Sequence, residues 1–118
     1  MIDLQQRWTP TQDDFDAFAR VSGDDNAIHV DPDFCADTTF GRTVSHGMLL
    51  YAKLWGMLKK NDPSLNTSSQ SLMFPNPAFA GEPLDLSIKQ ETQGRLIMRA
   101  VRVADGAECL IGKAEIRC

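Results

Sequence analysis

The sequence has no surplus of basic residues and no long apolar run, and each absence excludes a class of function. Lys and Arg number 12 against 16 Asp and Glu, so the formal net charge at pH 7 is −4. A chain that binds nucleic acid needs positive charge to attract the phosphate backbone. No apolar stretch approaches the roughly 18 residues that cross a bilayer, and residues 1–10 lack the character of a secretory signal. We therefore expect a cytoplasmic protein with neither a nucleic-acid nor a membrane partner.

Cysteine is also scarce. The three cysteines, Cys35, Cys109 and Cys118, are odd in number and widely spaced, which suits neither a disulfide framework nor a zinc site. We predict reduced thiols and no bound metal. Cys35 lies six residues beyond His29, but its short apolar surroundings favour a structural thiol over a nucleophile. The sequence has no glycine-rich phosphate loop either, so we expect no resident cofactor.

What the sequence does contain is an ordinary globular composition. Its 118 residues are 42% hydrophobic and 24% charged, enough for one hydrophobic core and too few for a second. Residues 2–8 predict an edge strand. A helix then starts within residues 9–11, where a proline and several aspartates suit the first turn. Three apolar residues at helical spacing give this helix one buried face: Phe15, Phe18 and Ala19.

The longest apolar stretch follows residues 45–47 and ends at residues 59–63 with two lysines and a proline, which predicts a long helix. Ser45 is the expected cap. The helix is apolar on nearly every side, so another element must wrap it, and a curved antiparallel sheet is the element that remains. Four stretches predict its strands: 69–74, 83–91, 96–104 and 108–117.

In these strands, two tracts show the period of two that marks one face of a sheet: Leu84, Leu86, Ile88 and Ile97, Arg99, Val101, Val103, with Arg99 breaking the second. The prolines and glycine of residues 75–81 indicate a bend. The predicted fold class is α+β, a single domain over residues 1–118 in which a curved antiparallel sheet wraps a long central helix.

The stretch 22–29 carries the chemistry that this fold would hold. Asp24 and His29 are five residues apart and cannot share a helix face, so a turn must bring them together. Gly23 ends the preceding helix, and Asn26 tolerates the left-handed conformation of such turns and bonds the main chain through its side chain. Asp25 is expected in solvent. A converging carboxylate and imidazole can hold a water and move its protons, which is general acid–base chemistry.

This stretch and the later 44–48 resemble the two motifs of the MaoC-like, or (R)-specific enoyl-CoA hydratase, family of hot-dog-fold proteins. In that family a helix ending Ser-Gly-Asp-x-Asn-Pro-hydrophobic-His carries the catalytic Asp and His, and a His-Gly-Met motif opens the long central helix. The likeness continues through residues 71–74 and 79–84. One departure is Ala27, which stands where the family has proline, and we expect a looser turn there.

The resemblance implies reversible hydration of a trans-2-enoyl-CoA to the (R)-3-hydroxyacyl-CoA, with Asp24 and His29 as catalytic residues. CoA would be a carrier on the substrate. The backbone N–H of Gly47 at the start of the long helix would form the oxyanion hole. Asn26, Ser45 and His46 are expected to support the site, His46 through a bond from its ring to the backbone, with a second base as the alternative.

Further expectations concern the pocket and the partners. The segment 31–33 predicts a short capped helix that carries Phe34 and Ala36 inward. The expected substrate contacts are Phe34, Phe40 and Leu50, with plain core residues as the alternative. Arg42 is interpreted as a surface residue, the alternatives being a carboxylate partner or a cofactor phosphate.

The edge strands of such a sheet favour a homodimer or higher homo-oligomer. Two other functions stay open: an acyl-CoA thioesterase on the same fold, and a non-catalytic acyl-CoA binding subunit. The acyl chain length and the choice between CoA and acyl carrier protein are also open.

Overall fold

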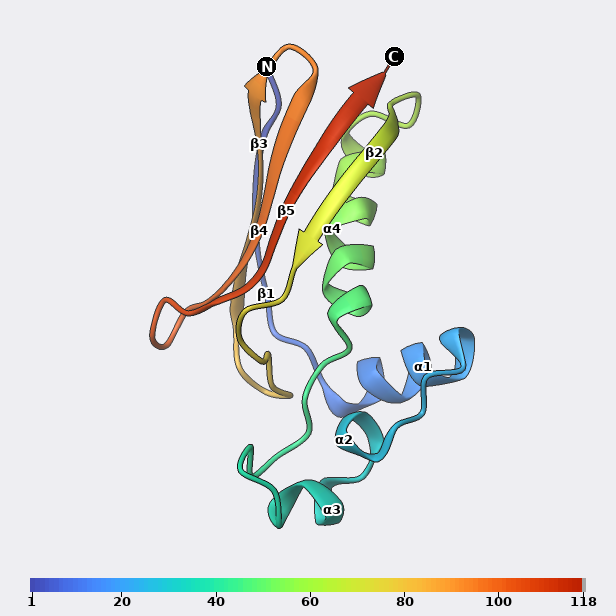
Figure 1. Ribbon diagram of the computed structural model, residues 1–118, viewed down its shortest axis with the longest axis vertical. Helices are drawn as coiled ribbons and strands as arrows, with labels where there is room; N and C mark the ends of the chain where they lie inside the picture. The colour runs from blue at the N-terminus through green and yellow to red at the C-terminus, as the bar shows by residue number, and fades with distance from the viewer. Residues whose placement is uncertain (118) are drawn as a thin grey trace.

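The computed structural model describes residues 1–117, so the prediction for the Cys118 thiol lies outside the described residues. The sheet has five strands. Figure 1 shows it curved along one side of a long helix, with the shorter helices gathered at the end opposite the two chain termini. The elements in chain order are β1 (Asp3–Trp8), α1 (Gln12–Ser22), α2 (Ala27–Val30), α3 (Pro32–Ala36), α4 (Gly47–Asn61), β2 (Asn66–Met73), β3 (Leu84–Thr92), β4 (Arg95–Arg102) and β5 (Glu108–Arg117).

The sheet is antiparallel, with the strand order β1-β3-β4-β5-β2. β1 and β2 each have one neighbouring strand, and β1 is thus the edge strand that residues 2–8 predicted. The alternation of apolar residues along β3 places Leu84, Leu86 and Ile88 on the inner face, and each is at most 1% exposed. The α+β hot-dog fold predicted from the sequence is confirmed.

The period-two tract of residues 97–103 does not form the inner face of β4. Leu96, Met98 and Ala100 are the buried set of β4, while Arg99 lies on the outer face and bonds Glu108. Both alternating sets of residues in this strand include apolar side chains, so the sequence of the strand alone does not show which face is buried. Pairing with β3 decides, because Ile88 stands opposite Met98 and Leu86 opposite Ala100 on one face.

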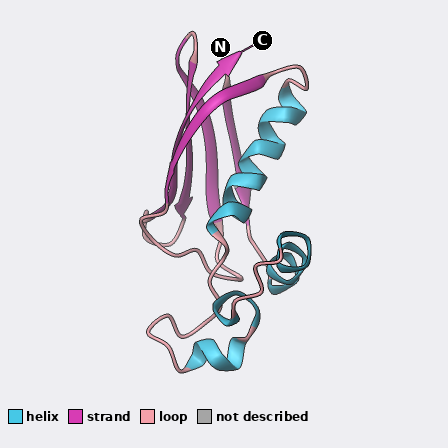
Figure 2. Cartoon of the chain, turned by 45° about the vertical axis from the view of Figure 1, so that its right-hand side comes forward, coloured by secondary structure: helices cyan, strands magenta, loops and turns pink. Residues whose placement is uncertain are grey.

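α4 packs its inner side against the sheet through Leu50, Leu54 and Leu58, all at most 2% exposed. The predicted packing of the sheet against this helix is confirmed, but the sheet does not cover every apolar side of it. Its outer side is exposed along Met48, Ala52 and Gly56, which follow one another at intervals of one helical turn. Figure 2, turned from the first view, shows this helix lying along one flank of the sheet.

Local side-chain and backbone contacts determine where the shorter helices begin and end. In α1 the Thr11 hydroxyl accepts from the Asp14 N–H while the Asp14 carboxylate accepts from the Thr11 N–H, a reciprocal cap. α1 ends at Gly23, whose φ of 80° is left-handed.

Asp31 caps α3 as predicted, but Phe34 is 49% exposed and Ala36 is exposed. The inward residue of α3 is Cys35, because only one face of a single helical turn contacts the body of the protein.

Cys35 and Cys109 are both buried free thiols. Burial raises the pKa of both side chains above the ordinary value for a thiol, so neither has the character of an activated nucleophile.

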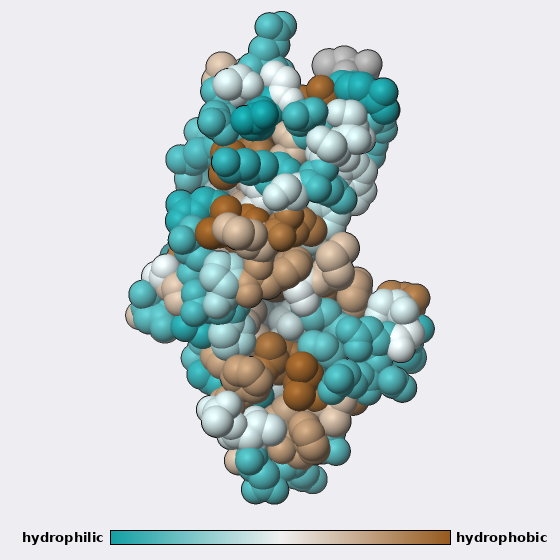
Figure 3. All heavy atoms as spheres, in the orientation of Figure 1, coloured by the Kyte–Doolittle hydropathy of each residue, from teal (hydrophilic) through white to brown (hydrophobic). Residues whose placement is uncertain are grey.

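Among residues 1–117 no helix has the length and apolarity needed to cross a membrane. Figure 3 shows that the face seen in Figure 1 is polar over its upper part, with apolar atoms gathered at mid-height and again lower down.

Candidate active site

Two segments that are distant in sequence meet at the end of the molecule where α1, α2 and α3 gather. The first, residues 24–29, follows α1, and the second, residues 43–47, leads into α4. The Val44 N–H donates to the Ile28 carbonyl over 2.8 Å, which joins the two main chains directly. The Ser45 N–H donates to the Ala78 carbonyl over 2.8 Å, which ties the second segment to the loop between β2 and β3.

Both histidines bind the main chain of the opposite segment. Nδ1 of His29 lies 2.6 Å from the Val44 carbonyl oxygen, and Nε2 of His46 lies 2.8 Å from the Asp24 carbonyl oxygen. The two rings are stacked, with centroids 3.9 Å apart. Each histidine therefore fixes the backbone that carries a residue of the other motif. The predicted bond from the His46 ring to a backbone group is present.

These contacts decide which of the two ring nitrogens carries the hydrogen in the neutral form of each histidine. A carbonyl oxygen only accepts, so Nδ1 of His29 must carry the proton, and in the neutral ring Nε2 is left as the acceptor. This Nε2 faces the Asp24 carboxylate, with 3.7 Å between Nε2 and Oδ2. That separation is too long for a direct hydrogen bond, and one water can lie about 2.8 Å from both atoms. The Asp24 side chain is 55% exposed and the His29 side chain 10%.

The His46 ring is in a different state. Its Nε2 donates to Asp24, which leaves Nδ1 bare and buried, without a hydrogen-bond partner among residues 1–117. A proton on Nδ1 would place an unpaired charge in the interior. Burial accordingly lowers the pKa of His46 below its usual range, against the opposing effect of the bond to Asp24. This arrangement suits a neutral positioning residue.

The turn between the acid and the base is held by Asn26. Its side chain caps α2 by accepting from the Ile28 N–H over 3.2 Å, the predicted kind of bond. The left-handed conformation expected for Asn26 is wrong, because its φ is −52° and Gly23 alone makes the left-handed step of this turn. Ala27 is the first residue of α2, a position where the N–H has no partner within the helix, so alanine replaces proline without breaking a helical bond. Asp25 is exposed, as predicted.

Gly47 is the first residue of α4, and within the described part of the chain its N–H meets no acceptor. The helix dipole adds partial positive charge at this N–H. Gly47 lines a cavity of about 360 Å³ together with Asp24, His29 and His46. The remaining lining residues of this cavity are Phe18, Ser22, Met48 and Phe74.

Ser45 does not cap α4, contrary to the prediction. The helix starts two residues later, at Gly47, and the residue at the capping position is His46, whose side chain makes no cap bond. The buried Ser45 hydroxyl instead donates to the His46 carbonyl over 2.9 Å. Because His46 already binds Asp24, Ser45 supports the site by fixing the main chain that carries His46.

The predicted substrate contacts divide into two groups. Phe40 and Leu50 line a second cavity of about 390 Å³ beside the first, whereas Phe34 lines neither cavity. Arg42 pairs with the Glu82 carboxylate over 2.6 Å, which is one of the two alternatives considered for it. It is therefore tied to the loop before β3 rather than left as a plain surface residue.

One supporting residue was missed entirely. Gln12, in the first turn of α1, donates from Nε2 to the His29 carbonyl over 2.9 Å and accepts from the Thr43 hydroxyl over 2.6 Å. It thereby joins the two segments of the site. A single glutamine at the start of a helix forms no pattern, so nothing in the sequence marked it. Phe74 was missed as well, although it ends the 71–74 stretch on which the family resemblance partly rests.

Asp24, His29 and His46 offer three atoms of ligand type within 4.8 Å of one another. This group fits a metal poorly, because Nδ1 of His29 and Nε2 of His46 already bind carbonyl oxygens and the other His46 nitrogen is buried. Only the Asp24 carboxylate and Nε2 of His29 remain, which is fewer than the three or four protein ligands of a zinc site. The group suits a bridging water better.

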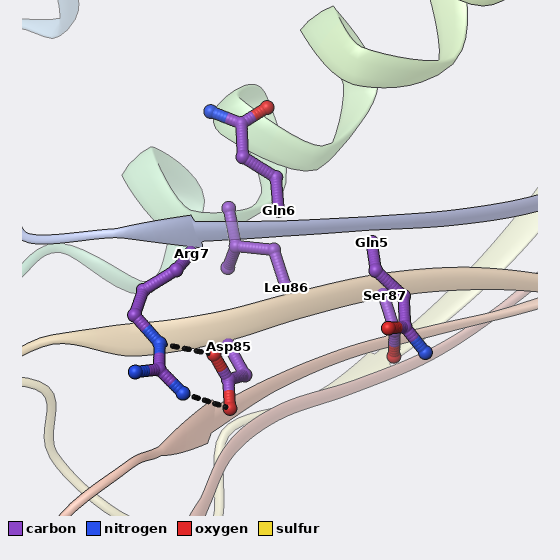
Figure 4. Close-up of a pocket in the computed structure, with 6 residues that line it drawn as sticks. All are labelled: Gln5, Gln6, Arg7, Asp85, Leu86 and Ser87. Carbon is purple, nitrogen blue, oxygen red and sulfur yellow. Dashed lines mark hydrogen bonds and ion pairs between the residues drawn. The ribbon is translucent and has the colours of Figure 1, made fainter.

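A third hollow, of about 340 Å³, lies at the β1–β3 edge of the sheet (Figure 4). Arg7 and Asp85 stand opposite each other there and form two hydrogen bonds, of 2.8 and 3.3 Å. The bond to Arg7 lowers the pKa of Asp85 below its usual range. Both charged groups are satisfied by each other, so we assign this hollow a structural role in pairing the edge strand.

The chain is similar in sequence to proteins of one family. The family model described as "MaoC like domain" matches residues 2–108. The chain is 39% identical over 75 residues to an (R)-specific enoyl-CoA hydratase of Aeromonas caviae, covering 62% of this chain and 56% of that protein. It is 32% identical over 112 residues to 3-hydroxyacyl-thioester dehydratase Y of Mycobacterium tuberculosis, covering 86% of this chain and 37% of that protein. The matches thus span about half or less of these relatives' lengths.

Solved structures of two hydratases are similar to this chain over nearly its whole length. The (R)-hydratase from A. caviae involved in PHA biosynthesis superposes with a TM-score of 0.87 at 28% identity, over 98% of this chain and 93% of that one. The unliganded R-hydratase PhaJ1 from Pseudomonas aeruginosa has the same TM-score at 27% identity, over 98% of this chain and 78% of that one.

Proposed function

We propose a hydration reaction for this chain, because the chain belongs to the MaoC-like domain family. The reaction is the reversible addition of water to a trans-2-enoyl thioester, giving the (R)-3-hydroxyacyl thioester, with CoA as the carrier. One observation carries the proposal: Asp24 and His29 face each other over 3.7 Å in the same cavity that receives the free N–H of Gly47. Acid–base groups and an oxyanion donor are the two requirements of this chemistry.

The water would lie between the acid and the base. It donates one hydrogen to Nε2 of His29 and the other to the Asp24 carboxylate, since both atoms accept. Its oxygen then has lone pairs free to attack the β-carbon of the enoyl group. In the neutral ring, the bond from His29 Nδ1 to Val44 leaves Nε2 as the acceptor and aims it at this water.

The thioester carbonyl would dock against the Gly47 N–H. As the water oxygen bonds to the β-carbon, the electrons of the double bond move onto the carbonyl oxygen and form an enolate. The N–H and the helix dipole stabilise that negative charge, an effect typically worth about a hundredfold or more in rate for one donor. The acid–base pair takes one proton from the water and returns one to the α-carbon, so the substrate gains one water molecule and the pair is regenerated.

The test is the loss of the conjugated enoyl-thioester absorbance when the purified protein meets crotonyl-CoA, with identification of the alcohol formed. Asp24→Asn and His29→Ala should each lower kcat by about a hundredfold or more, the usual range for removing a general acid or base. Asp25→Asn is the matched control, because that carboxylate is adjacent but exposed and lines neither cavity. It should retain the wild-type rate.

Other outcomes would replace the proposal. If absorbance holds while free thiol appears, water attacks the carbonyl carbon and the chain is a thioesterase. If no enoyl thioester changes while saturated acyl-CoA raises the melting temperature, the chain is a binding subunit. Equal losses in the Asp24→Asn and Asp25→Asn variants would remove Asp24 from the catalytic assignment.

A further inference from the structure

The candidate site consists of two adjacent cavities, and among the described residues only one side chain stands where they meet. The cavity that holds Asp24 and His29 and the second cavity of about 390 Å³ have two lining residues in common, Gly47 and Phe74. Gly47 contributes main chain that is fixed at the start of α4. Phe74 contributes a ring that is 44% exposed and has two rotatable side-chain bonds, so it is the part of the shared wall that can move.

The Phe74 ring lies directly on Gly47. A Cβ added to Gly47 would fall 2.7 Å from Cε1 and 2.8 Å from Cδ1 of the ring, closer than such atoms can approach. The ring therefore covers the main chain beside the N–H that would receive the thioester carbonyl. Any acyl chain that runs from the acid–base cavity into the second cavity must pass this ring.

The second cavity has the lining that a hydrocarbon chain requires. Its floor is deeply buried, since Leu50, Ala78 and Cys109 are each at most 2% exposed. Its two polar side chains are already occupied: Ser45 donates to the His46 carbonyl, and Asn76 donates to the Glu108 carbonyl. What remains facing the space is largely apolar, and the volume lies within the usual range of about 300–1,000 Å³ for ligand sites.

The first cavity is also largely apolar, since Phe18, Met48 and Phe74 line it, but one of its borders is polar. Beyond the acid–base pair it is bordered by exposed Ser22 and by Asp24, whose side chain is 55% exposed. The amide-rich carrier arm would leave beside these exposed polar groups, and the acyl chain would extend past Phe74 into the second cavity.

We propose that Phe74 is the residue that determines the acyl chain length accepted by this site, by separating the acid–base cavity from the second, apolar cavity. This inference rests on the proposed function and adds its substrate class: short-chain enoyl thioesters, with longer chains admitted only when the Phe74 ring moves aside. Removing the ring joins the two cavities, and enlarging it closes the passage further.

The test compares kcat/KM for trans-2-butenoyl-CoA and trans-2-octenoyl-CoA. Phe74→Ala should raise the octenoyl-to-butenoyl ratio by about tenfold or more, the lower end of discrimination by apolar pocket size. Phe74→Trp should lower that ratio. Met73→Ala is the matched control, because Met73 is the adjacent residue, is 58% exposed and lines neither cavity. It should leave the ratio at the wild-type value.

Retained turnover of butenoyl-CoA shows that each variant is folded. A ratio unchanged within twofold in Phe74→Ala, or an equal rise in Met73→Ala, overturns the inference while leaving the hydratase proposal standing.

Binding distinguishes the two proposals when no enoyl thioester is turned over. Calorimetric titration then measures the affinity for the saturated butyryl-CoA and octanoyl-CoA, which tests access of the acyl chain to the second cavity without a reaction. Tighter binding of octanoyl-CoA by Phe74→Ala than by the wild type, with butyryl-CoA unchanged, supports the inference although the proposed function has failed. No difference between the two proteins overturns it.

Discussion

At the scale of single residues, the site depends on two histidines that must stay in different states. His29 uses Nδ1 to bind a carbonyl and turns Nε2 toward the Asp24 carboxylate, whereas His46 uses Nε2 to bind a carbonyl and buries Nδ1. Protonation of His46 would create a buried charge with no acceptor. The folded state is therefore more stable when His46 is neutral.

This requirement predicts a pH dependence of stability. The pKa of His46 is lowered in the folded protein from its ordinary 6.5. As the pH falls below about 6.5, the unfolded chain takes up this proton more readily than the folded chain, so the free energy of unfolding decreases. We expect the melting temperature to fall more steeply from pH 7 to pH 5 in the wild type than in His46→Gln. Parallel curves for the two proteins would show that His46 does not contribute this dependence.

The residues that could be predicted from sequence are those whose spacing has a physical meaning. Asp24 and His29 cannot share a helix face, and Gly23 between helix and turn forces them together. Gln12 and Phe74 carry no such local signal, because their contacts join segments far apart in the chain. Ser45 misled the prediction since its sequence suits a cap, while the actual helix start is set by the contacts of His46.

At the scale of elements, periodicity located the strands and the long helix, and tertiary contacts decided which faces they bury. β4 carries apolar residues on both faces, and the observed inner face follows from its partner β3. In α3 one turn cannot bury three side chains, so Phe34 faces outward and Cys35 inward. Such choices require knowledge of the neighbouring element.

The stability of α4 should depend on its inner side. Leu54 is fully buried between this helix and the sheet, two turns from Gly47. Leu54→Ala should lower the free energy of unfolding by about 2–5 kcal/mol, as expected for truncating a buried leucine. The change is measured by urea denaturation. Ala52→Ser on the exposed outer side is the control and should cost less than about 1 kcal/mol. A cost below that level for Leu54→Ala would contradict the packing described.

At the scale of the whole molecule, the sheet is open at β2. Within residues 1–117 this strand pairs only with β5, so its other edge presents backbone groups that no strand of the same chain pairs over Asn66–Met73. An open edge of this length is a template for another strand. We propose that two copies pair through β2 into a homodimer with a two-fold axis, the arrangement in which the same strand meets itself.

The dimer predicts a mass of twice the 13.1 kDa chain in light scattering after size-exclusion chromatography. Introducing Ser69→Asp and Ser71→Asp together should shift the protein toward the monomer, because each new charge approaches its own copy across the axis. Both positions are exposed in the single chain, so the fold itself should tolerate the change. A wild-type protein that elutes as a monomer at all concentrations would exclude the proposal.

The crossed histidine contacts also give the site a cooperativity of its own. Because each ring fastens the segment that carries the other motif, losing one bond loosens the segment that presents the second ring, and the two fail together. The sheet and α4 have separate packing and need not open with them. Deuterium uptake should therefore show the Val44 amide, bonded to Ile28, exchanging through a small local opening, whereas amides in the middle of β4 exchange only when the whole domain unfolds. On heating, we expect the two segments that carry Asp24, His29 and His46 to separate together, at a lower temperature than the one at which the sheet melts.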